Sequence, residues 1–429
     1  MKVLNENAII NLEDGRKAKV LDVLGSGGQG TVYAVEIDGE RYAMKWYAKA
    51  PSEAFRQNLM KNVEEGSPSP MFLWPQAVTR IRFDSYGYIM PLKPDGYYEF
   101  TEFRLAKVRF RSMRAVITAA ILTCEAFRQL HAKGLSYQDL NDGGFFINPV
   151  TGQVMICDCD NVFPHGEQSG ILGKARYIAP EVVRGESMPN SYSDRFSMVV
   201  LLFMFFCIDH PLEGRNVVRY PCLTEDIERK LFGEQPCFIY DSDDASNRPV
   251  SGVHHNAINL WKLLPDKLHK AFCQELGKEK IMHPEQRMTE MEWIDMLIAV
   301  RDSLVRCPHC GDEAFIGDMT FCLNRQCRMD INVPLWLVSD TRHIPLIDGN
   351  MIFIGKKTRP VGRVVTRPDV PGMLIMQNIS DDTWQLTTPS GKSKNIDPKS
   401  FFPVKEGMRL SVTMEDGMPA PFIVSSCIS

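Results

Sequence analysis

The sequence predicts an α+β protein in four parts: a small β-rich lobe (1–92), a larger helical lobe (93–305), a cysteine-rich segment (306–332) and an all-β tail (333–429). Alternating apolar residues and Asp-Gly turns dominate the first part, whereas apolar residues three and four positions apart dominate the second. After Arg306 the helical period ends, and Gly, Pro, Asn and Asp turn signals continue through the tail. This change of pattern predicts the order of the parts.

The composition excludes some functional classes. The 429 residues carry a net charge of −4, and no basic block that would bind nucleic acid or an anionic membrane is present. The longest apolar runs, such as 196–208, are too short to cross a bilayer, and the first residues lack a signal-peptide apolar region. We therefore expect a soluble, cytoplasmic protein that binds neither nucleic acid nor membranes.

A glycine-rich turn followed by a lysine stands out in the β-rich lobe. Residues 24–33 read LGSGGQGTVY, and Asp38-Gly39 and Ala43-Met44-Lys45 follow. Asp-Gly supplies the positive φ angles of a tight hairpin, so the glycines lie at a strand-to-strand bend where backbone N–H groups can approach an anion. The pattern predicts a phosphate site, with a glycine turn that binds nothing as the alternative. Its candidate residues are Gly25, Ser26, Gly27, Gly28, Gly30, Val32 and Lys45.

Helical periodicity predicts helices at roughly 52–65, 111–131, 193–208, 256–276 and 289–305. Two aspartates follow short elements of the helical lobe. Asp139 lies in the loop after the 111–131 helix, and Asp158 follows the apolar strand 154–157. Two such carboxylates suit a site where one orients a hydroxyl group as base and the other holds Mg²⁺. The alternative is that both are turn or cap residues, which is the commoner role of aspartate.

In this order and spacing, the motifs resemble the protein kinase fold over roughly residues 17–300. The Gly-x-Gly-x-x-Gly-x-Val, Ala-x-Lys and Ala-Pro-Glu elements carry the resemblance. It implies that Lys45 contacts the α- and β-phosphates of ATP, and that Asp139 orients the acceptor hydroxyl. It further implies that Asp158 holds Mg²⁺ or Mn²⁺ and that Asp194 braces the catalytic loop from the helix beneath.

The resemblance also assigns structural partners. Glu181 and Arg287 are expected to form the ion pair that anchors the substrate-side loop. The glutamate that pairs with Lys45 in this family is not evident. Glu53 and Glu64 lie on the expected helix, but neither stands at the usual spacing. This partner stays open.

Several positions depart from the kinase pattern. Gly144 stands where kinases place a metal-binding Asn, and Tyr137-Gln138 where they place His-Arg. Asn141 has the chemistry to replace the lost amide ligand. Asp160, at the glycine of Asp-Phe-Gly, can add a second carboxylate, although each can instead be a turn residue. Without the Arg, and with Lys174 before the Ala-Pro-Glu element, switching by loop phosphorylation is not expected.

Four cysteines form two pairs after the helical lobe: Cys307, Cys310, Cys322 and Cys327. Four thiolates in this spacing fit tetrahedral Zn²⁺ and predict a zinc ribbon. Because protein fills all four positions, the ion would be structural. Disulfides are the alternative, which a reducing compartment disfavours.

The tail is expected to form a β-sandwich, with strands around 373–380, 384–386 and 404–412. The order of Asn-x-Ser, Trp, Gly and a late Gly before a strand is similar to a degenerate forkhead-associated domain. The Arg and Ser-x-x-His with which that family reads phosphothreonine cannot be placed, so phosphopeptide binding is not implied.

The whole arrangement resembles the bacterial Ser/Thr kinases of the tellurium-resistance-associated phosphorylation triad. The motifs at 72–75, 137–146 and 210–214, together with the cysteine pairs and the β tail, carry this resemblance. It implies a von Willebrand A-domain protein and a metal-dependent Ser/Thr phosphatase, encoded nearby, as substrate, partner and antagonist.

The leading hypothesis is therefore an Mg·ATP-dependent Ser/Thr protein kinase, with autophosphorylation and a von Willebrand A-domain acceptor among its reactions. Retention of Lys45, Asp139 and Asp158 favours it. The alternative is a nucleotide-binding pseudokinase scaffold, which Gly144 favours. A small-molecule phosphotransferase is a third hypothesis, because the fold does not fix the acceptor.

Overall fold

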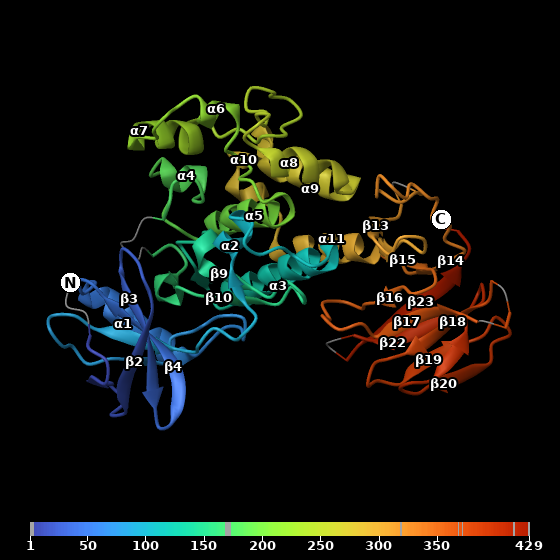
Figure 1. Cartoon of the computed structure of the whole chain (residues 1–429), viewed down its shortest axis with the longest axis horizontal. Helices are drawn as coiled ribbons and strands as arrows, with labels where there is room; N and C mark the ends of the chain where they lie inside the picture. Colours follow the sequence, from blue (N-terminus) through green and yellow to red (C-terminus); the bar gives the residue numbers. More distant parts are fainter. Residues whose placement is uncertain are drawn as a thin grey trace.

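Figure 1 shows the computed structural model, which describes residues 4–167, 173–317, 320–367, 369–370, 372–414 and 417–427. The β-rich lobe and the β-rich tail lie at opposite ends, with the helical lobe between them (Figure 1). This order of sheet, helices and sheets agrees with the predicted α+β class. The boundaries of the four parts stay predictions.

The N-terminal lobe is a six-stranded antiparallel sheet in the order β1-β2-β3-β4-β6-β5, with one helix. Its elements are β1 (Ile9–Asn11), β2 (Lys17–Ser26), β3 (Gly30–Ile37), β4 (Glu40–Tyr47), α1 (Glu53–Glu65), β5 (Ala77–Val78) and β6 (Gly87–Met90). Asp38 and Gly39 join β3 to β4 with φ angles of 52° and 84°, which confirms the predicted hairpin. Ser52 caps α1 by accepting a hydrogen bond from the N–H of Phe55, so the helix begins where the sequence predicts.

The helical lobe packs around one large apolar core. Its helices are α2 (Phe100–Arg104), α3 (Met113–Ala132), α4 (Pro180–Val183), α5 (Ser191–Cys207), α6 (Arg215–Val218), α7 (Glu225–Glu228), α8 (His255–Leu260), α9 (Asp266–Leu276), α10 (Lys278–Ile281) and α11 (Glu290–Asp302). Helix α5 is buried on all sides from Phe196 to Cys207, and this almost wholly apolar part lies in the core. Within the described residues, no helix combines the length and apolar character that a membrane span requires.

Short strands and tight helical turns connect these helices and carry the loops of the candidate site. The strands are β7 (Tyr98–Glu99), β8 (Leu135–Ser136), β9 (Phe145–Ile147), β10 (Val154–Ile156) and β11 (Phe163–Pro164). The turns are η1 (Asp142–Gly144), η2 (Cys159–Asn161), the π-helical η3 (Arg229–Glu234), η4 (Trp261–Leu263) and η5 (Pro284–Gln286).

Three predicted elements differ from the structure. The helix expected over 256–276 is interrupted, and α9 starts only after Pro265, which has an extended backbone (φ −72°, ψ 157°). Proline lacks the N–H that would continue the helix. The helix expected over 289–305 ends at Asp302, because the next residues enter a strand. The strand expected over 404–412 starts only at Arg409, since Gly407 (φ 78°) lies in a turn.

The C-terminal part contains a two-stranded sheet and two larger sheets, in the orders β15-β14-β23-β22-β19-β20 and β16-β17-β18-β21. The strands are β12 (Leu304–Arg306), β13 (Glu313–Phe315), β14 (Leu335–Val338), β15 (His343–Leu346), β16 (Met351–Ile352), β17 (Gly362–Thr366), β18 (Leu374–Asn378), β19 (Trp384–Thr387), β20 (Ser393–Ile396), β21 (Phe401–Pro403), β22 (Arg409–Thr413) and β23 (Pro419–Ser425). One apolar cluster draws residues from both larger sheets, including Leu337, Val364 and Met376. The described tail is therefore a β-sandwich.

The tail is fastened to helix α11 of the helical lobe. Arg342 makes two hydrogen bonds to the Asp302 carboxylate, at 2.6 and 2.9 Å. The guanidinium of Arg301 donates to the backbone carbonyls of Gly355 and Lys357. Asp302, Arg342 and Arg301 are largely buried side chains, so these contacts hold the two parts together more firmly than surface pairs would.

Candidate active site

Lys45 lies on β4 and is buried beneath the glycine turn. Its ammonium Nζ donates to both carboxylate oxygens of Asp160, at 3.1 and 2.9 Å, and to Asp158 Oδ1 at 3.1 Å. It also donates to the side-chain carbonyl of Gln29 at 3.0 Å. Burial alone would lower the pKa of Lys45, but the two carboxylates raise it well above its ordinary value. The partner that the sequence left open is therefore a pair of aspartates.

Asp160 is completely buried at this point. The Tyr47 hydroxyl donates to its Oδ2 at 2.7 Å, and the Tyr88 hydroxyl donates to its Oδ1 at 3.0 Å. Burial, followed by the charge of Asp160, raises the pKa of both phenols well above the usual value. Both tyrosines therefore remain protonated donors, and the Asp160 carboxylate is fully hydrogen-bonded.

Asp158 lies directly after strand β10 in the left-handed region, with φ 56°. This backbone turn directs the side chain back toward Lys45. The Asp158 side chain is 44% exposed, whereas that of Asp160 is fully buried. Asp158 is thus the member of the pair that solvent, and therefore a cation, can reach.

Asp139 lies in the loop that Asn141 stabilises. The Asn141 amide nitrogen donates to Asp139 Oδ1 at 3.2 Å and to the Asp139 carbonyl at 3.0 Å. Its amide oxygen accepts from the N–H of Gly143 at 3.0 Å. Burial, with a smaller contribution from the charge of Asp158, raises the pKa of Asp139 to about 6. A carboxyl group with this pKa is suited to accept a proton near neutral pH.

Asp194 supports this loop from helix α5. Its Oδ2 accepts the N–H of Tyr137 at 2.6 Å, and its Oδ1 accepts the N–H of Gln138 at 3.3 Å. The ring of His131 contacts the same carboxylate at 3.0 Å. The predicted brace from the helix beneath is confirmed.

Gln138 precedes Asp139, at the position where protein kinases have an Arg, and its side chain makes a neutral contact. Its side-chain amide donates to the carbonyl of Glu167 at 2.5 Å. The chain after strand β11 is thus held through a backbone carbonyl, which requires no phosphate group. The loop in question includes residues 168–172, which lie outside the described residues, so the expectation that loop phosphorylation does not switch the site stays a prediction.

Glu181 and Arg287 form the predicted ion pair. Two parallel contacts of 2.8 and 2.9 Å join the guanidinium to the carboxylate. The side chain of Glu181 is only 8% exposed, and that of Arg287 is only 2% exposed. Arg287 also donates to the carbonyl of Tyr192 at 2.9 Å. The pair links the start of helix α4 to the segment that precedes helix α11.

The glycine turn joins β2 to β3, as predicted. The N–H of Gly27 donates to the carbonyl of Gly30 at 2.9 Å, and the hydroxyls of Ser26 and Thr31 lie 3.2 Å apart. A Cβ at Gly30 would lie 2.1 Å from the backbone oxygen of Trp46, so the close approach of β4 requires this glycine. The whole predicted set, Gly25, Ser26, Gly27, Gly28, Gly30 and Val32, lies along this one β-hairpin.

Apolar side chains next to the polar site form one packed cluster that spans both lobes. Ala43 and Val32 come from the N-terminal sheet, and Cys157 and Phe146 come from the hairpin that carries Asp158. Apolar side chains therefore lie beside the predicted phosphate site, and this is the environment that a flat aromatic base prefers.

The sequence reasoning missed the roles of Tyr47, Tyr88 and Gly173. A signal for the tyrosines was present, because Tyr47 is two residues from Lys45 on one strand and the strand period places both on one face. Tyr88 is the direct cross-strand partner of Lys45. A Cβ at Gly173 would lie 2.9 Å from Asp139 Oδ1, so this segment passes close to Asp139. Nothing in the sequence pattern signals that approach.

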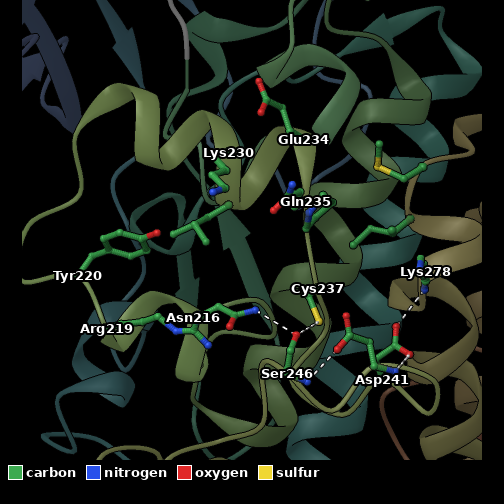
Figure 2. A pocket seen from close by; sticks show the side chains of 15 residues that line it. Asn216, Arg219, Tyr220, Lys230, Glu234, Gln235, Cys237, Asp241, Ser246 and Lys278 are labelled. Carbon is green, nitrogen blue, oxygen red and sulfur yellow. Dashed lines mark hydrogen bonds between the residues drawn. The ribbon is translucent and has the colours of Figure 1, made fainter.

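A separate pocket of about 490 Å³ lies in the helical lobe (Figure 2). Arg219, Lys230 and Lys278 are among its lining residues, together with Asp241. The carboxylate of Asp241 is engaged by backbone N–H groups, including that of Lys278 at 3.0 Å. The lining contains none of the predicted catalytic or metal-binding residues, so this pocket is distinct from the site around Lys45.

The four predicted cysteines lie together, with all four sulfur atoms within 4.8 Å of one another. Cys307 and Cys327 Sγ are 3.8 Å apart, and Cys310 and Cys322 Sγ are 3.6 Å apart. A disulfide would require about 2 Å, whereas four sulfurs about 2.3 Å from a central Zn²⁺ are separated by about 3.8 Å. The thiols are free and their geometry fits a tetrahedral metal ion.

Comparison with family models matches the protein kinase domain to residues 84–289. This range contains Asp139, Asp158 and the Glu181–Arg287 pair, and it supports a protein kinase domain in this chain. A kinase domain uses ATP and Mg²⁺. The match begins after the glycine turn and Lys45, which the structure nevertheless brings to the same site.

Curated relatives are similar over a shorter stretch. Protein kinase C delta type of Mus musculus is 34% identical over 150 residues, which is 30% of this chain and 22% of the relative. Protein kinase C delta type of Homo sapiens is 33% identical over 149 residues, with the same coverage. This chain thus covers only 22% of the length of these relatives.

Proposed function

We propose that this protein is an Mg·ATP-dependent Ser/Thr protein kinase that transfers the γ-phosphoryl group to protein hydroxyl groups. The observation that carries the proposal is the convergence of Lys45 with Asp158 and Asp139, two residues of the segment that matches the protein kinase domain. The kinase C delta relatives favour Ser/Thr acceptors over other classes.

Each residue has a separate role in this reaction. Lys45 would bind the α- and β-phosphates, with the backbone N–H groups of the glycine turn above them. Asp139 would orient the acceptor hydroxyl and take its proton, aided by the hydrogen bond from Asn141. Catalysis then rests on positioning and on neutralising phosphate charge.

The metal ligands are part of the proposal. Asp158 is exposed enough to bind Mg²⁺ or Mn²⁺, and the Asn141 amide oxygen, which faces one N–H donor, keeps capacity for a cation. Asp160 was a further candidate. Its oxygens already accept from Lys45, Tyr47 and Tyr88, so the contacts favour Asp158 and Asn141.

A pseudokinase scaffold is the second candidate function. Gly144 favours it, because the amide ligand that kinases place there is absent, and a Cβ at this position would lie 3.4 Å from the Tyr137 hydroxyl. A scaffold would bind nucleotide through Lys45 without transferring phosphate.

The test is a transfer assay with labelled ATP and Mg²⁺ or Mn²⁺, on the full chain alone and with a mixture of candidate acceptor proteins. Label transfer by the wild type that Asp158→Ala abolishes is the expected result. Asp243→Asn, an exposed aspartate of the helical lobe, is the matched control and should transfer as the wild type does. Nucleotide binding without transfer would refute the kinase proposal in favour of the scaffold.

The partners implied by the triad resemblance complete the proposal. A von Willebrand A-domain protein would be the acceptor, and a metal-dependent Ser/Thr phosphatase would reverse the reaction, in a bacterial cytoplasm. The forkhead-associated-like relationship of the tail is also a proposal. In the described tail, Asn378 and Ser380 hydrogen-bond to each other, and Trp384 donates to Ser380 at 3.1 Å, which supports a structural role for these residues.

We further propose that the four cysteines hold one structural Zn²⁺ as a zinc ribbon. The purified chain should contain about one Zn²⁺ per molecule, and Cys307→Ser should lose it. Elemental analysis after gel filtration measures this content, and Cys427→Ser, an exposed cysteine outside the cluster, is the matched control. If the chain without bound metal unfolded at the same temperature as the purified wild-type chain, this result would contradict a structural zinc site.

A further inference from the structure

We propose that Asp160 is a positioning residue that replaces the helix glutamate of protein kinases and fixes Lys45 without a charged residue from helix α1. In kinases the strand lysine is held by a glutamate of the neighbouring helix, and that pair must be in place for activity. In this chain Asp160 takes the place of that glutamate as the partner of the strand lysine. The catalytic role of this contact rests on the proposed function, whereas the contact between Lys45 and Asp160 is independent of it.

The geometry of the contact carries the inference. Lys45 Nζ lies 2.9 and 3.1 Å from the two oxygens of Asp160, and both side chains are almost completely buried. A buried ammonium requires a counter-ion, because burial without one is strongly unfavourable. Tyr47 and Tyr88, from β4 and β6, fix the carboxylate from the sheet side. Lysine, carboxylate and both phenols are thus anchored on the sheet and on η2.

Helix α1 takes no charged part in this arrangement. Its buried face presents Phe55 and Leu59 to the apolar cluster. Its polar contacts with the segment after η2 are neutral, because the amides of Asn58 and Asn62 both donate to the carbonyl of Val162, at 2.8 and 3.0 Å. A displacement of α1 would therefore break amide contacts and apolar packing, but not the lysine–carboxylate pair.

Asp160 and Asp158 therefore have different roles. Asp160 uses both oxygens on Lys45 and the tyrosines, whereas Asp158 gives Lys45 a single contact and stays 44% exposed. With Asp160 as the permanent counter-ion, Asp158 can leave Lys45 for a metal ion without leaving the ammonium unpaired.

Thermal unfolding of the nucleotide-free full chain tests the pairing. Asp160→Asn leaves the buried charge of Lys45 with only its single carboxylate contact, to the exposed Asp158, so the double variant Lys45→Met/Asp160→Asn should melt above Asp160→Asn alone, by about 2–4 °C or more. The matched controls are Glu53→Gln and Glu64→Gln on helix α1, each combined with Lys45→Met, whose shifts should simply add. Additive shifts for Asp160, or coupling of Lys45 to either glutamate, would overturn the inference.

Two further measurements keep the result decisive. If Asp160→Asn alone does not fold, recovery of a folded chain in the double variant supports the pairing, and failure of both contradicts it. Affinity for Mg·ATP, measured with a fluorescent ATP analogue, should fall about ten-fold in Asp160→Asn, and Glu53→Gln should bind as the wild type does. Because neither measurement requires phosphate transfer, an inactive chain would refute the proposed function and leave this inference standing.

Discussion

Replacement of Asp139 by Asn is expected to slow phosphate transfer by about 10²–10⁴-fold, the usual contribution of a general base. The amide has nearly the same shape as the carboxylate, so the loop that Asn141 stabilises should persist. It cannot accept the proton of the acceptor hydroxyl. In the proposed function nucleotide binds through Lys45 and the glycine turn, so its affinity should change by no more than about three-fold.

The pH dependence of the same reaction provides a second readout. The pKa of Asp139 is raised to about 6, so its carboxylate becomes protonated as pH falls through that value. The wild-type rate should therefore decline below about pH 6, and the Asp139→Asn chain should lose this acidic limb. Steady-state rates from about pH 5 to about pH 8, the range in which a carboxyl of this pKa titrates, measure both effects. A variant with wild-type turnover would remove Asp139 from the mechanism.

Loss of the Glu181–Arg287 pair is expected to destabilise the helical lobe by about 3–5 kcal/mol. Glu181→Ala leaves the guanidinium buried with no carboxylate, because Arg287 is 2% exposed in the folded protein. The double variant Glu181→Leu/Arg287→Met should recover part of this loss, since no charge then stays buried. Urea unfolding followed by tryptophan fluorescence measures the free energy of unfolding.

The chain supplies a matched control for this experiment. Arg367 and Asp369 form the same two-contact geometry, at 2.7 and 2.8 Å, but their side chains are 47% and 62% exposed. Arg367→Ala should lower the free energy of unfolding far less than Glu181→Ala does, because solvent screens exposed pairs. Equal losses for Glu181→Ala and Arg367→Ala would show that burial does not determine the strength of the buried pair.

Local signals in the sequence predicted the local structure well. The Asp38-Gly39 hairpin and the helix predicted at 52–65 depend on residues close to one another in the sequence, so their chemistry is visible there. The break before α9 was missed because the apolar period continues on both sides of Pro265, which hides the interruption. The cysteine spacing predicted the cluster because four ligands in two pairs have few other arrangements.

The counter-ion of Lys45 could not be predicted in the same way. Asp160 is 115 residues away in sequence, and the contact forms only when the two lobes pack. Family expectation directed attention to helix α1, and Asp160 was considered only as a metal ligand or a turn residue. The Glu181–Arg287 pair is almost as distant, at 106 residues, but there the resemblance supplied both partners.

The attachment of the tail has a consequence for how the tail and the helical lobe can move relative to each other. Arg301 and Arg342 fix the tail to helix α11 through buried contacts, instead of leaving it on a loose tether. A module on a flexible linker searches a volume, and its effective concentration at the cleft depends on linker length. A tail that is mounted in this way keeps a nearly constant distance from the loop of Asp139, instead of sampling many distances as a tethered module does.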